Sequence, residues 1–234
     1  MRYAIYFTPA PDSMLWRLGS SALGYDAVLG QDVPFPTHPL YADPAFLRRL
    51  ETPRRYGFHA TLKAPFALRS GSTERDLLEC AAALAAHQTP ILVPGLEVTL
   101  LGDFLALRPA TEHAELNRLA ATAVRELDHL RIALTDADRA RRLAASLTTR
   151  QVGHLDRWGY PYIFEDFRFH LTLSGALAEP MRAPASTALK ALFSQAMGAL
   201  QIDALSVLVQ PTPQSRFVVI ERLPLQARAA PTEL

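Results

Sequence analysis

The sequence has one cysteine, almost no excess charge and no long apolar run. Cys80 has no second thiol for an internal disulfide, which fits a reducing compartment. The formal net charge of +1 gives no overall attraction to nucleic acid or to an anionic membrane. No apolar run approaches the roughly 18 residues of a membrane span, and the N-terminal segment is too short and too alternating for a signal peptide. We therefore expect a cytoplasmic protein that binds neither membranes nor long nucleic acids.

A short phrase occurs twice in the chain, as Phe58-His59-Ala60-Thr61-Leu62 and as Phe169-His170-Leu171-Thr172-Leu173. With 7 His and 16 Thr among 234 residues, chance gives about 0.5 occurrences of His-x-Thr, so one copy would carry no information. Requiring the flanking Phe and Leu lowers the chance expectation to about 0.004 per copy. The duplication therefore indicates one site shared by two motifs.

Each copy has the alternation of a half-buried strand, in which every second side chain points to the same face. In the first copy this rule places His59, Thr61 and Lys63 together on a polar face. In the second copy the polar face consists of Arg168, His170, Thr172 and Ser174. Each strand thus presents an imidazole and a hydroxyl side by side.

Periodicity, capping residues and Gly or Pro breaks predict the other elements. Strands are predicted at 2–7, 91–101, 104–108, 202–210 and 216–223. Helices are predicted at 14–23, 72–87, 112–131, 135–152 and 183–200, with a long loop at 24–53, a helical turn at 45–50 within it, and a frayed tail after Pro224. The two motif strands, near 58–63 and 168–174, are each followed by a helix and a pair of strands. This duplication predicts an α+β fold in which residues 1–234 form a single bilobal domain with one motif strand from each half.

The motifs resemble the two His-x-Thr motifs of the 2H phosphoesterase superfamily, which includes 2′,3′-cyclic nucleotide phosphodiesterases and RNA ligase-like proteins. The stretches Arg55–Lys63, Gly159–Tyr162 and Phe167–Leu173 resemble its DUF1045 branch, which is associated with phosphonate metabolism. The resemblance implies two lobes of antiparallel sheet and helices related by a rough two-fold axis. It also implies that the motifs face each other in a central cleft and hydrolyse or bind a phosphodiester without metal. It does not supply a substrate.

Two imidazoles and two hydroxyls suit the in-line opening of a cyclic phosphate. One histidine activates water and the other protonates the leaving oxygen, while the threonine hydroxyls hold the non-bridging oxygens. The sequence does not say whether His59 or His170 is the base. Further candidates for substrate binding are Lys63, Arg55, Arg168, Ser174 and Tyr160. The arginines are also consistent with solvated rim residues, and Tyr160 with packing between the lobes.

The other histidines have no partner at metal-ligand spacing, so we predict neither a metal nor another cofactor. They are His38, His87, His113, His129 and His154. The run Arg139, Arg141 and Arg142 is interpreted as the exposed face of a helix.

The sequence favours a metal-independent hydrolase that acts, as a monomer, on a small phosphorylated metabolite or nucleotide. Two alternatives remain: an RNA-end 2′,3′-cyclic phosphodiesterase or ligase-like enzyme, and a module that binds a phosphate ligand without turnover. The low net charge weighs against a long polynucleotide. The intact pair of motifs weighs against an idle site.

Overall fold

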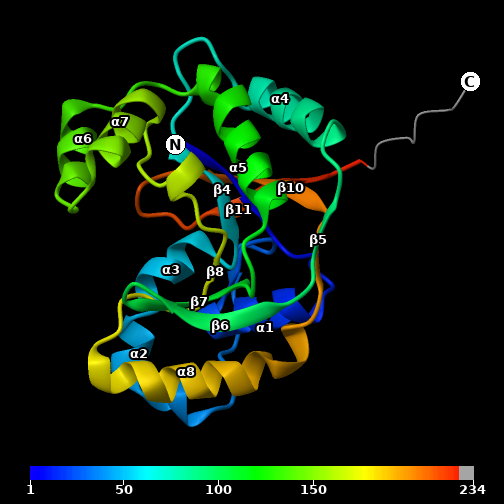
Figure 1. Cartoon of the computed structure of the whole chain (residues 1–234), viewed down its shortest axis with the longest axis vertical. Helices are drawn as coiled ribbons and strands as arrows, with labels where there is room; N and C mark the ends of the chain where they lie inside the picture. The colour runs from blue at the N-terminus through cyan, green and yellow to red at the C-terminus, as the bar shows by residue number, and fades with distance from the viewer. Residues whose placement is uncertain (227–234) are drawn as a thin grey trace, which may run out of the picture.

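The alternating segment near the N-terminus forms the central strand of the larger sheet. In the computed structural model, which describes residues 1–226, this strand is flanked by one strand of the first motif and by one from the C-terminal region (Figure 1). The described strands are β1 (Arg2–Phe7), β2 (Tyr25–Asp26), β3 (Gln31–Asp32), β4 (Ala60–Phe66), β5 (Ile91–Val93), β6 (Leu96–Leu101), β7 (Phe104–Pro109), β8 (Leu171–Thr172), β9 (Leu200–Ile202), β10 (Ala204–Gln210) and β11 (Val218–Pro224). The described α-helices are α1 (Met14–Leu23), α2 (Pro44–Arg48), α3 (Glu51–Tyr56), α4 (Glu74–Ala86), α5 (Ala114–Glu126), α6 (Asp136–Leu143), α7 (Thr149–Trp158) and α8 (Glu179–Phe193).

Two antiparallel sheets carry the two motifs. The larger has the order β11-β10-β1-β4 and bears the first motif, whereas the smaller has the order β6-β7-β8 and bears the second. Helices α4 and α5 contact the larger sheet, and α8 runs along β6 and β7 on the opposite side of the molecule (Figure 1). The α+β class and the antiparallel sheets are therefore confirmed. Each sheet combines strands from both halves of the chain, so a lobe does not coincide with a half.

The apolar residues of the two motifs join the sheets in one core. Phe58 is fully buried and packs over Gly19 of α1, where a Cβ atom would lie 2.1 Å from the phenyl ring. Phe169 of the second motif lies with its ring centroid 6.1 Å from that of Phe7 in β1. The polar side chains of both motifs are thus held above a shared apolar floor.

Several helix boundaries differ from those predicted. The helix predicted at 112–131 ends at Glu126 and is followed by a 3₁₀ turn, and the helix predicted at 135–152 is divided into α6 and α7. The division arises because Thr148 begins a new helix with a capping box to Gln151. The predicted loop at 24–53 contains β2, β3 and α2 and runs into α3 at Glu51. The tail predicted to fray falls largely on residues 227–234, outside the described residues.

The second motif forms a shorter strand than predicted. Only Leu171 and Thr172 pair regularly with β7, because the N–H groups of Leu173 and Ser174 both donate to the carbonyl of Leu105. The alternation within the motif is kept, with Leu171 and Leu173 buried. No helix among residues 1–226 is long and apolar enough to cross a bilayer.

We predict that Phe58→Ala lowers the free energy of unfolding by about 3–5 kcal/mol, because it removes a fully buried ring and leaves a cavity beside α1. Urea unfolding followed by circular dichroism measures this change. The control is Leu92→Ala, since the Leu92 side chain is 62% exposed and its loss should cost less than about 0.5 kcal/mol. A cost below about 1 kcal/mol for Phe58→Ala would contradict the packing described.

Candidate active site

His59 lies at the entrance to β4 and is fixed by the residues around it. Its Nδ1–H donates to the carbonyl of Gly57 at 2.9 Å, so its Nε2 faces the hydroxyl of Thr61 at 3.2 Å. The ring stacks on Tyr6 of β1, with centroids 3.7 Å apart and planes 18° apart. Gly57 has φ +74°, and a Cβ there would lie 2.6 Å from that of Ala27, so glycine is required beside this histidine.

His170 repeats the same contact in the second motif. Its Nδ1–H donates to the carbonyl of Arg168 at 2.7 Å, again two residues earlier, and its ring lies 5.6 Å from that of Phe104. Both histidines thus have their Nδ1 proton bound to the backbone, which leaves Nε2 as the nitrogen available for proton transfer. The sequence duplication corresponds to a duplicated hydrogen-bonding geometry.

The two motifs border adjoining cavities. One, of about 330 Å³, is lined by His59, Thr61 and Thr172, and the other, of about 430 Å³, by Thr61 and His170. Besides Thr61, the shared lining residues are Ala64, Phe104 and Tyr160. The four motif side chains therefore lie along one continuous hollow between the sheets, which we call the cleft.

Burial determines the charge of both imidazoles in the cleft. Desolvation lowers the pKa of His59 to about 4, and the charge of His170 acts in the same direction. Desolvation likewise lowers the pKa of His170, and the charge of Arg108 adds to the effect. At neutral pH both rings are neutral, with Nε2 able to accept a proton.

Lys63 does not share the cleft, contrary to the prediction. Ile5 of β1 pairs with Lys63 whereas the next residue, Tyr6, pairs with Thr61, so β4 has one extra residue at this point. This bulge breaks the alternation, and the Lys63 ammonium instead donates to the carbonyl of Val124 at 3.1 Å and to Asp128 at 3.3 Å. The side chain is 4% exposed, and burial lowers its pKa to about 8.

The other predicted binding residues divide into two groups. Tyr160 and Ser174 line the cleft, although the Ser174 hydroxyl is engaged by the Leu105 N–H and the Gly175 carbonyl. Arg55 is an exposed residue of α3 and is not among the lining residues. Arg168 is exposed at the edge of the His170 cavity.

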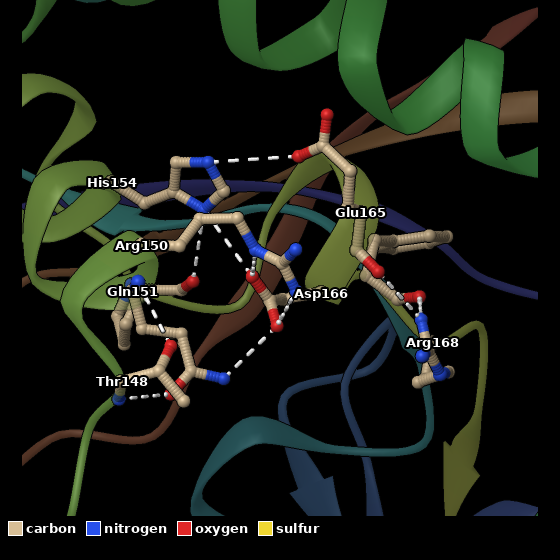
Figure 2. Close-up of polar contacts among 9 residues, drawn as sticks. Thr148, Arg150, Gln151, His154, Glu165, Asp166 and Arg168 are labelled. Carbon is tan, nitrogen blue, oxygen red and sulfur yellow. Dashed lines mark hydrogen bonds and ion pairs between the residues drawn. The ribbon is translucent and has the colours of Figure 1, made fainter.

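Residues leading into the second motif are tied to α7 by a polar cluster (Figure 2). Asp166 accepts two hydrogen bonds from Arg150, at 2.8 and 3.0 Å, and one from Gln151 at 3.0 Å. His154 lies 3.6 Å from the same carboxylate, and Arg168 donates to the carbonyl of Glu165 at 2.9 Å. Helix α7 thus fixes the backbone that carries the carbonyl to which His170 donates.

Sequence reasoning missed two arginines and two tyrosines that line the cleft. Arg142 was interpreted as part of an exposed helix face, but it is half-buried and lies 5.5 Å from the centroid of the Tyr160 ring. Arg2, Tyr6 and Tyr56 also line the cavity. The only sequence signal for these positions is the four-residue spacing of Arg2 and Tyr6, which places both side chains on one face of a strand. Among the described residues, no group of three or more His, Cys, Asp or Glu is arranged to hold a metal ion.

Comparison with protein families identifies the chain. The family described as "Protein of unknown function (DUF1045)" matches residues 61–218. The chain belongs to the DUF1045 family. The predicted branch is thereby confirmed. The match includes Thr61 and the whole second motif, and it begins two residues after His59.

One curated protein and two solved structures are similar to this DUF1045 chain over nearly its whole length. "Ribose 1,5-bisphosphate phosphokinase PhnN" of Janthinobacterium sp. (strain Marseille) is 40% identical over an alignment of 232 residues that covers 97% of this chain and 51% of that protein. This chain therefore spans about half the length of that relative. The solved structure of TT0787 of Thermus thermophilus is similar at 14% identity and a TM-score of 0.46, and the match covers 98% of this chain and 100% of that chain. E. coli LigT complexed with 3′-AMP is similar at 14% identity and a TM-score of 0.43, and the match covers 96% of this chain and 97% of that chain.

We predict that the His59 imidazole makes folding less favourable as the pH falls. His59 takes up a proton near pH 6.5 in the unfolded chain but only near pH 4 in the folded chain. Its full contribution to the free energy of unfolding is therefore present above pH 6.5 and is lost as the pH falls from 6.5 to 4. His59→Gln should flatten this part of the profile by on the order of 2 kcal/mol. Urea unfolding at several pH values measures it.

The control for this measurement is His87→Gln, which removes an exposed histidine at the end of α4 without touching the cleft. NMR titration of the imidazole signals gives the pKa directly. A His59 signal that titrates near the ordinary value of about 6.5 would contradict the assigned burial.

Proposed function

We propose that this DUF1045 chain is a phosphoesterase that opens a small cyclic phosphate or phosphodiester of nucleotide or phosphoribosyl type, in phosphonate metabolism. The observation that carries the proposal is the repeated anchoring of an imidazole by its Nδ1–H, once at His59 and once at His170, beside a threonine in one cleft. A pair of imidazoles whose Nε2 atoms carry no proton can exchange protons with the substrate, so one can act as base and the other as acid in in-line displacement.

The threonines supply hydrogen bonds to the reacting phosphate. Thr61 lines both cavities and Thr172 lines the first, so both threonines border the hollow in which the phosphate would bind. As negative charge accumulates on the non-bridging oxygens, these donors stabilise it in a partly desolvated site. The side chains of the cleft thus provide proton transfer and charge stabilisation without requiring a metal ion.

Both histidines are neutral before substrate binds, so one of them must gain a proton before it can act as the acid. A neutral imidazole can take a proton from water, but the leaving oxygen needs a protonated partner. A bound phosphate anion raises the pKa of the nearer imidazole, because an opposite charge favours its protonated form. We propose that, when the substrate anion binds, one of the two histidines takes up a proton from solvent and thereby becomes the acid.

The name of the relative suggests the chemical class of the substrate. That relative is named for phosphorylation of ribose 1,5-bisphosphate, and this chain corresponds to about half of it. The present sequence contains no Gly-x-x-x-x-Gly-Lys-Ser/Thr, the loop with which P-loop kinases bind nucleotide phosphates. We infer that the kinase of the relative resides in its unmatched part, and that the half represented here acts on a related sugar phosphate.

We predict that His59→Ala and His170→Ala each lower kcat/KM by about 10²- to 10⁴-fold, because each removes a proton-transfer group. Thr61→Val and Thr172→Val should each cost about 10²-fold by removing a donor to the phosphate. The assay uses chelator-treated protein with 2′,3′-cyclic nucleotides and phosphoribosyl 1,2-cyclic phosphate, followed by phosphorus NMR.

His87→Ala is the matched control and should leave turnover unchanged, with circular dichroism confirming that every variant is folded. Full turnover by either motif-histidine variant would refute the mechanism. If a cyclic phosphate raised the melting temperature of the wild type but was recovered unchanged, the protein would be a binding module instead. A steep loss of substrate affinity with salt would favour the RNA-end enzyme.

A further inference from the structure

Two arginines in the cleft take no part in the proposed proton transfers. Arg2 is the first residue of β1, and Arg142 lies near the end of α6. Both line the cavity that contains His59, Thr61 and Thr172. Neither forms an ion pair with a carboxylate of residues 1–226, and none of the residues that line this cavity is acidic.

The Arg142 side chain is held in the cavity without an ion-pair partner among residues 1–226, because the nearby Asp138 carboxylate pairs with Arg141. The Arg142 Nε atom is buried and has no hydrogen-bond partner in the described part of the chain, and its guanidinium lies over the ring of Tyr160. Burial lowers the pKa of Arg142 and the positive charges of Arg141 and Arg2 act in the same direction, whereas Tyr160 and Asp138 act in the opposite one. An unpaired buried donor and two like charges brought together are each unfavourable unless an anion binds between them.

The Arg2 side chain is positioned by a neutral partner. Its Nε donates to the amide oxygen of Gln210 at 2.9 Å, and Gln210 is 1% exposed and donates in turn to the carbonyl of Ser215 at 2.8 Å. An amide orients the guanidinium but does not neutralise it, as a carboxylate would. The Arg2 guanidinium therefore has a fixed orientation and keeps its positive charge for a ligand.

Arg2 and the residue on which His59 stacks lie toward opposite ends of strand β1. Arg2 and Tyr6 are four residues apart on a strand with regular pairing to β10, so they share a face and their Cα atoms lie roughly 13 Å apart. Because His59 stacks on Tyr6, the reacting phosphate lies toward one end of this distance and Arg2 begins at the other. A ligand that contacts both His59 and Arg2 must therefore extend beyond a single phosphate group, and both residues line the same cavity of about 330 Å³.

We propose that Arg2 and Arg142 form a second anion subsite, and that the substrate is a small phosphodiester carrying an additional phosphate group about one sugar away from the reacting one. This inference rests on the proposed function for the reacting phosphate. A bidentate guanidinium suits a terminal phosphate dianion, whereas the neutral imidazoles suit the singly charged diester. The second phosphate would therefore set both affinity and the orientation of the sugar.

The test compares a pentose 1,2-cyclic phosphate with and without a phosphate on its 5-hydroxyl. For wild type we expect kcat/KM to be at least about 50-fold higher for the phosphorylated member. In Arg142→Gln and Arg2→Gln this ratio should fall below about fivefold. Arg141→Gln is the matched control and should keep the wild-type ratio, because Arg141 pairs with Asp138 at the surface and does not line the cavity. No buried residue lies on α6, so Arg142→Gln is expected to fold normally.

A binding experiment separates failure of the subsite from failure of the proposed function. Ribose 5-phosphate is titrated calorimetrically into wild type, the His59→Ala/His170→Ala double variant and Arg142→Gln. We expect the double variant to bind it and Arg142→Gln to bind at least about tenfold more weakly, even if no cyclic phosphate is opened. An unchanged affinity in Arg142→Gln, no binding to wild type, or equal wild-type kcat/KM values for the two pentoses would overturn the second subsite.

Discussion

The hydrogen bond from each motif histidine to a carbonyl two residues earlier is the constraint on which the cleft depends. It fixes the tautomer, so that Nδ1 carries the proton and Nε2 remains an acceptor. The carbonyls in turn depend on their surroundings. That of Gly57 requires a backbone that only glycine adopts easily, and that of Arg168 depends on the cluster around Asp166. The apolar residues of the motifs hold the whole arrangement on a single core.

This anchoring also couples the charge of His59 to the role of Thr61. While the imidazole is neutral, its Nε2 can only accept, so the threonine hydroxyl donates to it across 3.2 Å. Once the imidazole is protonated, Nε2–H donates instead and the threonine hydroxyl is free to donate to a phosphate oxygen. Protonation of His59 would therefore add two favourable interactions with an anion, the charge itself and a released hydroxyl.

Many features of the fold and of the motifs could be predicted because they depend on residues that are close in sequence. The alternation around His59 and His170, the hairpin between β6 and β7 and the caps of α1 and α4 all follow from residues adjacent in sequence. The position of Lys63 could not be predicted, since one extra residue in β4 turns it away and nothing in the local pattern marks the bulge. Which side chains beyond the motifs reach the cleft depends on contacts between distant segments, so those of Arg142 and Arg2 were missed.

The cleft contains arginines, which stay charged, and histidines, which exchange protons, and this difference matters for catalysis. Arginine stays protonated at neutral pH, so it can bind a dianion without exchanging protons, whereas the histidines must exchange them. Had the arginines surrounded the histidines, their positive charge would have lowered the imidazole pKa values further and opposed formation of the acid. With Arg2 at one end of β1 and the His59 imidazole against Tyr6 toward the other, binding energy comes from a group that does not titrate at neutral pH. That energy can then hold the sugar in the orientation that in-line attack requires.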